Sequence, residues 1–540
     1  MDEMLSKVKR LSGMATPDGR SLKEVLAYEG VSLWWFIEHS AYLRLKGDRC
    51  RKLTNQRHLI YLVCASMKFF ILIKSLFRCV FGKLGKFPKT AGSKRIMVCS
   101  SLWHWRETQD QTTLRPKKDD VIVGGVMDAL ERDGFDVLGI DRDDSHLTDF
   151  KRFFDKLVCG KTPWRPVEAY LTLGMVRTAF SESRSMEKKW DEFLRHLASE
   201  DKLVFNRLSG DFKVFFVYHI FQAILHMEMA KRAIESDTPE LIVIINEHSD
   251  SGRAIVMAGK LLGIPTLAIQ HGFYAHDSVM YFNNPGEFSN EISTKYRQRP
   301  DKIAVYGPWI KNLFIKNFNY PREAVVVTGQ PRYDILTKLE KGFNREEFCR
   351  NYNLDPDKKI ALVITQPLDI AERRDIFLRS VLNALGRFSD ITILIKPHPR
   401  EDENWHKTVL REERMDATVL GRDSNIYEAL CACDVIITIS STTIIEAMIL
   451  GKPVIMLNLA RSPDRAPYVK DGAGLGVYRK EDLPRTIKEA LYGKKTREKL
   501  KRAERKFVYR HAYKQDGKAT ERVINLIKKM IKQSKGRQYV

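Results

Sequence analysis

Residues 433–458 read CDVIITISSTTIIEAMILGKPVIMLN, and this stretch decides the predicted fold. An apolar run ends in four hydroxyl residues, a short helical pattern follows and stops at Gly451, and a second apolar run comes next. Short buried strands that alternate with helices are typical of parallel β-sheets with helices on their faces. The stretch therefore predicts one strand–helix–strand unit of an α/β domain.

The same alternation occurs in two blocks of the chain. In residues 241–272, LIVIINEHSDSGRAIVMAGKLLGIPTLAIQHG, a strand is followed by a polar loop, a helix closed by Gly263 and a second strand. The pattern breaks in the polar residues 281–301 and resumes at KIAVYG, residues 302–307. These blocks predict two Rossmann-like domains, divided near residue 300, that face each other across a cleft.

The chain also has a region before the two domains and a tail after them. The tail is rich in lysine and arginine, and so is the end of the N-terminal region. The predicted organisation is a helical, basic N-terminal region (1–92), a first Rossmann-like domain (93–300) with a helical insertion (about 156–237), a second Rossmann-like domain (301–500) and a basic helical tail (501–540) that crosses back to the first domain.

The 540-residue chain carries a formal net charge of +23, which predicts a polyanionic neighbour such as nucleic acid, anionic lipid or a phosphorylated substrate. No nucleic-acid-binding motif accompanies the basic segments, so nucleic acid is not expected as a partner. The eight cysteines are scattered without metal-ligand spacing, and several lie inside apolar runs. They predict reduced, packed thiols in a cytoplasmic protein.

Residues 59–81, LIYLVCASMKFFILIKSLFRCVF, are long enough to cross a bilayer but are interrupted by Lys68, Lys74 and Arg78. On a helix these three cations fall within about a third of the circumference, beside a broad apolar face. The favoured prediction is an amphipathic helix in the interface of an anionic membrane, with its cations among the headgroups; a bilayer span and a packed core helix are the alternatives. The N-terminus lacks the apolar core of a signal peptide. A peripheral position on the inner face of the cell membrane is therefore expected.

Polar residues follow two neighbouring strands of the first domain. Glu247 and His248 end one strand, and Gln270, His271 and Gly272 end the next. Ligands of open parallel sheets bind at the carboxyl ends of the strands, so these residues are candidates for a substrate site. His271 is the candidate general base, with Glu247 to orient it, because a neutral imidazole can accept a proton near pH 7. The alternative is that His271 only caps its strand.

The second domain offers a candidate phosphate site. Ser440, Ser441, Thr442 and Thr443 are expected at a helix N-terminus, where backbone N–H groups and the helix dipole attract a phosphate. Glu446 lies one helical turn further along, where it can accept hydrogen bonds from a ribose diol. The alternatives are simple N-capping by the hydroxyl residues and an exposed first-turn carboxylate. The remaining candidate donor-binding residues are His398 in the loop IKPHP, Lys396, Arg332 and Gly329.

These motifs carry a resemblance to a known superfamily. The sequences IKPHP, SSTTIIEA followed by GKPVI, and the closing segment that ends in DGKATERV (516–523) resemble those of GT-B glycosyltransferases, and the likeness covers about residues 94–527. VTGQPRYD (327–334) and DGKATERV resemble the patterns of glycerophosphotransferases, whereas QHG and the SSTT-Glu pattern occur more widely in surface-polysaccharide transferases. Within that superfamily the chain is similar to the CDP-glycerol glycerophosphotransferases of teichoic acid synthesis and to capsule and polysialic acid transferases. It has Ile-Ser-Ser-Thr-Thr where the former usually carry an Asp-Tyr-Ser-Ser type sequence, so a sugar nucleotide is an alternative donor.

The resemblance implies a transferase. A nucleotide-activated donor would bind the second domain, and a cell-surface polysaccharide or lipid-linked acceptor would bind the first, near Gln270, Gly272 and His248. His271 or Glu247 would take the acceptor proton, and the candidate phosphate site would neutralise the leaving nucleotide. No cofactor is expected, and no metal ion either, since no Asp-x-Asp motif ends a strand.

Two other functions are compatible with this architecture. A sugar-nucleotide 2-epimerase would be expected to carry an Arg-Pro-Glu type cluster after the first strand, where this chain has SSLWHWRE, residues 100–107. A non-catalytic membrane scaffold would keep the fold and lose the chemistry. Assays with UDP-, CMP- and CDP-linked donors would separate the three functions.

Overall fold

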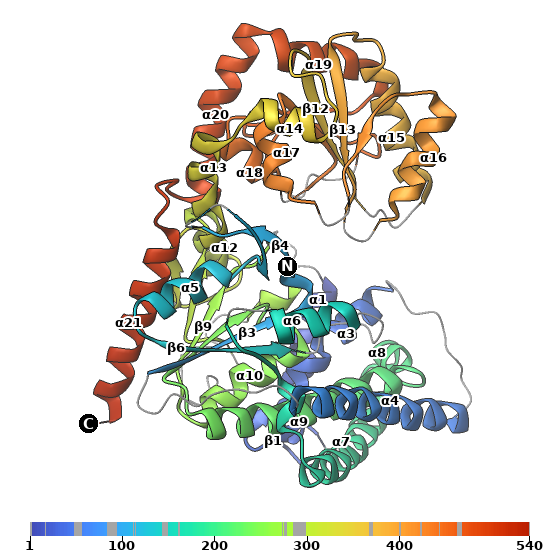
Figure 1. Ribbon diagram of the computed structural model, residues 1–540. Coiled ribbons are helices and arrows are strands. Elements are labelled where there is room, and N and C mark those ends of the chain that lie inside the picture. Colours follow the sequence, from blue (N-terminus) through green and yellow to red (C-terminus); the bar gives the residue numbers. More distant parts are fainter. Residues whose placement is uncertain are drawn as a thin grey trace.

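The computed structural model describes most of the chain. The described residues are 3–16, 18–47, 57–83, 94–111, 113, 115–142, 150–159, 162–272, 274, 278–283, 299–366, 371–398, 401–421, 424–441, 443–461 and 467–538. Two α/β domains, each built on a parallel sheet, follow one another along the chain (Figure 1). The predicted pair of Rossmann-like domains is therefore confirmed.

The first domain contains a parallel sheet in the strand order β11-β10-β9-β8-β3-β6-β7. Its central strand β8 is buried at every position, which is why it reads as the unbroken apolar run LIVII. The strands are β3 (Arg95–Ser101), β6 (Asp136–Arg142), β7 (Trp164–Pro166), β8 (Leu241–Ile245), β9 (Thr266–Ile269), β10 (Lys302–Val305) and β11 (Val325–Val327). A short antiparallel hairpin, β4 (Trp105–Gln109) and β5 (Pro116–Asp120), follows the carboxyl end of β3.

The predicted boundary near residue 300 is wrong. Strand β10 pairs in parallel with β9, Lys302 opposite Leu267, and β11 pairs with β10. The polar residues 281–301 therefore connect two strands of one sheet, and the first sheet ends only at Val327. The chain passes to the second domain through η5 (Pro331–Ile335), α13 (Leu336–Gly342) and α14 (Arg345–Asn351).

The second domain contains a parallel sheet in the order β14-β13-β12-β15-β16-β17. The stretch 433–458 folds as predicted into β15, a helix and β16, whose residues Ile436 and Val454 are paired. Gly451 follows that helix with a φ of +65°, a conformation that glycine adopts without strain. The elements are β12 (Lys359–Ile364), α15 (Ala371–Leu385), β13 (Ile391–Lys396), α16 (Glu403–Glu413), β14 (Thr418–Val419), α17 (Ile426–Ala432), β15 (Val435–Thr438), α18 (Thr443–Ile449), β16 (Val454–Leu457), β17 (Leu475–Val477) and α19 (Leu483–Tyr492).

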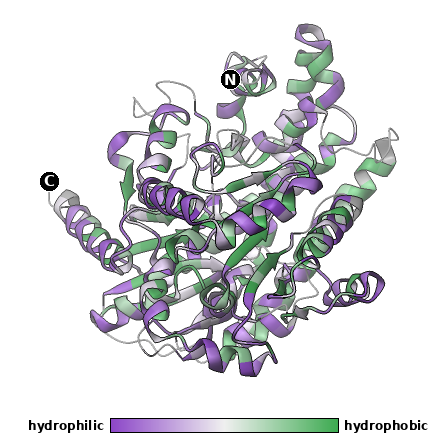
Figure 2. Ribbon diagram, turned by 90° about the horizontal axis from the view of Figure 1, so that it is seen from above, coloured by the Kyte–Doolittle hydropathy of each residue, from purple (hydrophilic) through white to green (hydrophobic). Residues whose placement is uncertain are grey.

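Helices cover both faces of the first sheet. The long helix α9 is buried over most of its circumference because it lies beneath other helices as well as against the sheet. Figure 2 shows the strands in green at the centre of the molecule, with helices of mixed purple and green around them. These helices are α5 (Gly124–Arg132), α6 (Phe150–Cys159), α7 (Leu173–Glu200), α8 (Lys202–Leu208), α9 (Phe212–Asp237), α10 (Asp250–Leu261) and α12 (Pro308–Lys316).

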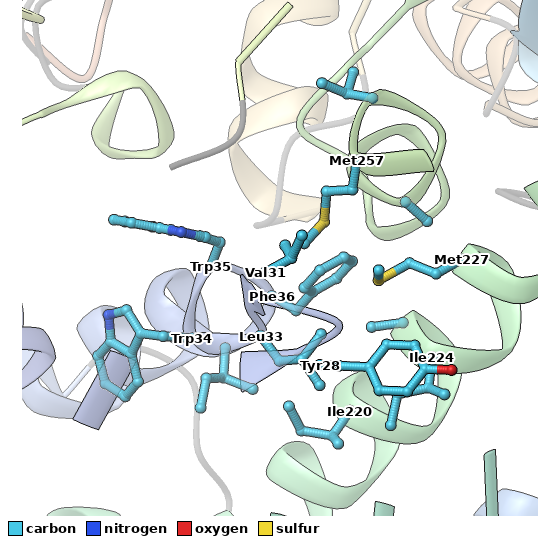
Figure 3. Packing of buried hydrophobic residues seen from close by; sticks show 14 of the residues in the cluster. Tyr28, Val31, Leu33, Trp34, Trp35, Phe36, Ile220, Ile224, Met227 and Met257 are labelled. Atoms are coloured by element: carbon cyan, nitrogen blue, oxygen red, sulfur yellow. The ribbon is translucent and has the colours of Figure 1, made fainter. Parts of the chain in front are cut away.

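The N-terminal region packs into the core of the first domain. Tyr28 and Phe36 lie against Ile220, Ile224 and Met227 of α9 (Figure 3), and all of them belong to one buried cluster. The region is therefore part of the first domain's hydrophobic core. Its elements are α1 (Glu3–Gly13), α2 (Leu22–Val25), β1 (Ala27–Tyr28), β2 (Val31–Ser32), α3 (Trp34–Lys46) and α4 (Arg57–Lys83).

Helix α4 turns its cationic face toward the protein, the opposite of the prediction. Lys68 points inward, where its Nζ lies 2.7 Å from Glu187 Oε1 on α7. Arg78 is buried and pairs with Asp141 and Glu168, each at 2.8 Å. These two cations are therefore unavailable to lipid headgroups, and the exposed face of α4 is the apolar one. Among the described residues, no helix is long and apolar enough to cross a membrane.

The C-terminal tail joins the two domains. Helix α20 (Lys494–Ala512) packs on the second domain, and α21 (Ala519–Gln538) lies along the first (Figure 1). The carboxylate of Asp334 accepts hydrogen bonds from the backbone N–H groups of Ala519 and Thr520, at 2.9 and 2.7 Å. The motifs VTGQPRYD and DGKATERV thus meet at the start of α21, where Asp334 caps the helix.

Candidate functional site

His271 lies at the carboxyl edge of the first sheet, directly after β9, as predicted. Its ring is partly exposed, and the centroid of the His104 ring lies 6.2 Å away. Burial lowers the pKa of His271 to about 3, with smaller contributions from His104 and Arg142. A β-carbon added at Gly272 would meet open space. His271 is therefore a neutral imidazole beside room for a ligand.

Glu247 lies behind this edge and reaches His271 only through aromatic side chains. Its Oε1 accepts a hydrogen bond of 3.3 Å from Tyr281 and lies 3.6 Å from Nε2 of His248, whose ring contacts Tyr281. Tyr281 packs on Tyr274, whose hydroxyl is 3.5 Å from Nδ1 of His271. Burial raises the pKa of Glu247 to about 7. Glu247 and His248 thus form an interior cluster with Tyr281, and the structure shows no direct contact of Glu247 with His271.

The Gln270 side chain is buried and forms hydrogen bonds with the protein backbone. Its Oε1 accepts a 2.8 Å hydrogen bond from the backbone of Tyr306, and its Nε2 donates to the carbonyl of Gly272, also at 2.8 Å. These bonds tie the ends of β9 and β10 together and fix the backbone around His271. Gln270 therefore shapes the edge of the sheet, and the prediction that it contacts an acceptor is not supported by its buried amide.

In the second sheet, the predicted phosphate-binding residues are held by local contacts. The N–H of His398 donates to Glu401 Oε2 at 3.0 Å, which orients the IKPHP loop. Ser440 donates to Gln366 Oε1 from both its N–H and its hydroxyl. Ser441 Oγ accepts from the N–H of Thr443, as in simple N-capping of α18. Thr442 lies outside the described residues.

Two of the predicted donor-binding residues have structural roles. Lys396 is buried, and its Nζ donates to the carbonyl of Gly421 at 2.8 Å. Gly329 has a φ of +80°, and a β-carbon there would lie 3.2 Å from Ala519 Cβ and 3.3 Å from Arg522 Nη2. Gly329 is therefore required for the close approach of α21.

Arg332 and Glu446 form an ion pair between the two parts of the chain. Arg332 Nη2, in η5 after the last strand of the first sheet, lies 2.8 Å from Glu446 Oε1 on α18. Tyr427 of α17 donates to the same oxygen at 3.4 Å. Glu446 is buried, and its charge raises the pKa of Arg332 even though burial opposes the charged form. The pair places a cation and a carboxylate at the junction of the domains.

Sequence reasoning missed His104 and Arg106, which follow β3 at the same sheet edge. Arg106 is exposed, yet desolvation lowers its pKa, and the charge of Arg332 lowers it further. Arg106 therefore lies near Arg332, where the first sheet meets the second domain. The hairpin that carries Arg106 also contacts the second domain, where Gln109 Nε2 donates to Glu428 Oε1 at 3.0 Å. The signal was WHWR directly after a strand end, which was compared only with an epimerase pattern.

The edge of the first sheet and the domain junction therefore bring together two kinds of group. Neutral imidazoles, His104 and His271, lie on the side of the first sheet, and the cations Arg106 and Arg332 lie at the junction with the second. Such a set can accept a proton on one side and neutralise a phosphate on the other. The described residues contain no group of three or more metal-ligating side chains. A separate surface hollow lies along α20, beside Lys495, Arg502 and Lys506.

Comparisons with known proteins identify the family of the chain. Residues 260–529, half of the chain, match the family model described as CDP-Glycerol:Poly(glycerophosphate) glycerophosphotransferase. A lipid-A-disaccharide synthase from Geobacter sulfurreducens is 22% identical over 255 residues, which are 45% of this chain and 60% of that protein. The chain thus spans less than two thirds of the length of that curated relative.

Solved structures resemble the chain in fold. A Listeria monocytogenes protein assigned as a UDP-N-acetylglucosamine 2-epimerase is 12% identical, with a TM-score of 0.50, over 82% of this chain and 98% of that one. The wall teichoic acid polymerase TagF is 13% identical, with a TM-score of 0.47, over 88% of this chain and 99% of that one. At these identities the likeness concerns the fold alone.

Proposed function

The chain belongs to the CDP-glycerol:poly(glycerophosphate) glycerophosphotransferase family, and from this premise we propose that it moves a group from a nucleotide-activated donor to a hydroxyl acceptor. Glycerophosphate from CDP-glycerol is the first candidate for the group. A cell-surface polysaccharide or a lipid-linked carrier is the proposed acceptor. The observation that supports this best is the row of imidazoles and guanidinium groups from His271 through His104 and Arg106 to Arg332.

Each end of this row has a proposed task. An imidazole at the edge of the first sheet accepts the acceptor's hydroxyl proton, the role that the sequence gave to His271. Arg106 and Arg332 neutralise the charge of the leaving nucleotide phosphate, with His398 on the facing loop. Glu446 binds the ribose diol. The proposed reaction uses no metal ion, because guanidinium groups can supply the positive charge.

The test is a donor screen with purified full-length protein. CDP-glycerol, UDP-linked sugars and CMP-linked sugars are incubated with and without a poly(glycerophosphate) acceptor, and the released nucleotide and extended acceptor are measured. We expect acceptor-dependent release of CMP from CDP-glycerol and a loss of turnover in Arg106→Gln. Arg485→Gln, on the surface of α19, is the matched control. Epimerised sugar without transfer would favour an epimerase, and no consumption of any donor would favour a scaffold.

We also propose that the enzyme works at an anionic membrane surface, through the exposed face of α4. This α4 face consists of large apolar side chains that are 41–65% exposed. At about 100° per residue they fall within about a third of the helix circumference, along one side of the helix. Large apolar side chains that gather on one exposed face mark a site that contacts a protein partner or a membrane. The residues of the α4 face are Leu59, Leu62, Phe69, Phe70, Ile73, Leu76 and Val80.

The neighbouring helix α7 supplies the positive charge that α4 turns inward. Lys68 of α4 pairs with Glu187 of α7, so the two helices lie side by side. The exposed cations of α7 recur at intervals of seven and four residues and therefore form one stripe. An apolar face beside a cationic stripe suits the boundary between acyl chains and anionic headgroups. The stripe consists of Arg177, Arg184, Lys188 and Arg195.

Sedimentation with liposomes tests this attachment. The variant Phe70→Ser/Ile73→Ser should lose most of its binding to vesicles that contain phosphatidylglycerol. Ile376→Ser, which removes an equally exposed apolar residue of α15 in the second domain, is the control and should bind as the wild type does. If the double variant sediments as fully as the control, the α4 face does not hold the membrane.

A further inference from the structure

The structure contains a hydrogen-bonded chain that ends at His104. Ser100 is the last residue but one of β3, and its Oγ is 2.5 Å from Asp120 Oδ2 at the end of β5. The same Oγ is 3.1 Å from Nδ1 of His104. Ser100 and Asp120 are buried, whereas His104 is partly exposed at the sheet edge. These hydrogen bonds therefore connect the protein interior with the exposed edge of the first sheet.

The direction of these bonds fixes the proton on His104. Asp120 Oδ1 accepts from the backbone N–H groups of Ile122 and Val123, at 2.9 and 3.1 Å. A carboxylate only accepts hydrogen bonds, so the single proton of Ser100 points to Asp120. Ser100 Oγ can then only accept from His104, which must carry its proton on Nδ1. Nε2 of His104 is left with a lone pair that can take a proton.

His104 is also fixed in position and uncharged. Its carbonyl accepts a 3.0 Å hydrogen bond from the N–H of Val121, which anchors the loop after β3. Burial lowers the pKa of His104 to about 4, against the attraction of Asp120. The charges of Arg142, Lys156 and Arg106 lower it further. A neutral, oriented imidazole is the form that a general base requires.

Among the residues that the structure describes, none gives His271 an equivalent support. The hydrogen-bonding group recorded next to its ring is the Tyr274 hydroxyl, 3.5 Å from Nδ1, which is at the limit for such a bond. A hydroxyl can donate or accept, so this contact leaves the proton of His271 unassigned. Of the two imidazoles whose centroids lie 6.2 Å apart, His104 is the one whose tautomer is set by a buried carboxylate.

We propose that His104, oriented by Ser100 and Asp120, is the group that accepts the proton from the acceptor hydroxyl, with His271 beside it contacting the same substrate. This assignment rests on the proposed function. The new O–P bond to the transferred group forms as the P–O bond to the nucleotide breaks. The hydroxyl proton moves to Nε2 of His104, and the nucleotide leaves as a monophosphate. The proton is then released to solvent.

Kinetics with four variants test the assignment. His104→Gln should lower kcat by about 10²–10⁴-fold, the usual loss for a general base, while the affinity for CDP is unchanged. His271→Gln should lower kcat less. Ser100→Ala should lower kcat by removing the relay while His104 stays in place. The assignment is overturned if His104→Gln keeps kcat within about threefold of the wild type while His271→Gln lowers kcat by about 10²–10⁴-fold.

Asp120→Asn is the most informative variant, because it should reverse the direction of the hydrogen bonds while all three side chains stay in place. The Asn oxygen still accepts from Ile122 and Val123, so its amide N–H₂ points to Ser100. Ser100 must then donate to Nδ1 of His104, which moves the imidazole proton to Nε2. We expect turnover to fall about as far as in His104→Gln, although the ring remains.

A readout independent of activity decides between failure of this assignment and failure of the proposed function. In ¹⁵N-histidine-labelled protein, long-range ¹H–¹⁵N spectra distinguish the two imidazole tautomers, with His104→Gln to identify the signal. We expect Nδ1–H in the wild type and Nε2–H in Asp120→Asn. An Nε2–H signal in the wild type would overturn the assignment. Absence of turnover with every donor would instead refute the proposed function, and the spectra would still decide the state of His104.

Discussion

The sharpest prediction for the donor site concerns Glu446→Ala. Glu446 is only 3% exposed, and its Oε1 accepts hydrogen bonds from Arg332 at 2.8 Å and Tyr427 at 3.4 Å. If the carboxylate also binds the ribose diol, its removal costs one charged hydrogen-bonding partner, about 1–3 kcal/mol. This corresponds to about 5- to 150-fold weaker binding of CDP.

The loss of affinity must be separated from loosening of the domain junction. Arg332→Ala breaks the same ion pair and keeps the Glu446 carboxylate, so it is the matched control. Calorimetry with CDP and 2′-deoxy-CDP then isolates the diol contact. We expect the wild type and Arg332→Ala to prefer CDP, and Glu446→Ala to bind the two nucleotides equally. If Glu446→Ala retains the wild-type preference, the carboxylate is only the partner of Arg332 and the diol assignment is refuted.

Three further predictions concern the cap of α21, the dependence of stability on pH and the absence of a metal ion from the reaction. Asp334→Ala removes the cap of α21 and should lower the free energy of unfolding by about 1 kcal/mol in urea titrations; an unchanged midpoint would contradict the capping role. Burial lowers the pKa of His104 and His271 to about 4 and about 3, so the unfolded chain binds protons below about pH 6.5 that the folded chain does not. Stability should therefore fall from pH 6.5 toward pH 4, and less so in His271→Gln. Chelation with EDTA should leave transfer unchanged, and restoration by added Mg²⁺ would argue against a metal-free reaction.

The elements that were predicted correctly have local signals. Residues 433–458 became β15, α18 and β16 because the apolar runs, the helical pattern and Gly451 all lie within 26 residues. The boundary near residue 300 was wrong because it depended on pairing. Whether the strand at Lys302 joins the sheet of Leu267 is decided by packing between distant segments, and a polar stretch between two strands looks the same as a linker.

For the site, the sequence predicted the sheet edges and not the partners of each side chain. His271 and Glu446 are where the strand ends and helix starts placed them. Lys396 and Gly329 lie in the predicted loops, but their contacts with Gly421 and Ala519 cannot be inferred from local sequence. The importance of His104 depends on Asp120, which reaches it through Ser100 only after the β4–β5 hairpin has folded back.

The orientation of α4 shows the same limit most clearly. Helical periodicity correctly separates an apolar face from a cationic one, but it does not say which face points to the protein. For Arg78 that choice is made by Asp141 and Glu168, two buried carboxylates that would both lose their ion pair with it if the helix turned over, leaving Lys156 to pair with Asp141. Burying Arg78 against them therefore outweighs burying the apolar face, which is left exposed. The leucines and phenylalanines of α4, and not its buried cations, are therefore the side chains that we propose to contact acyl chains.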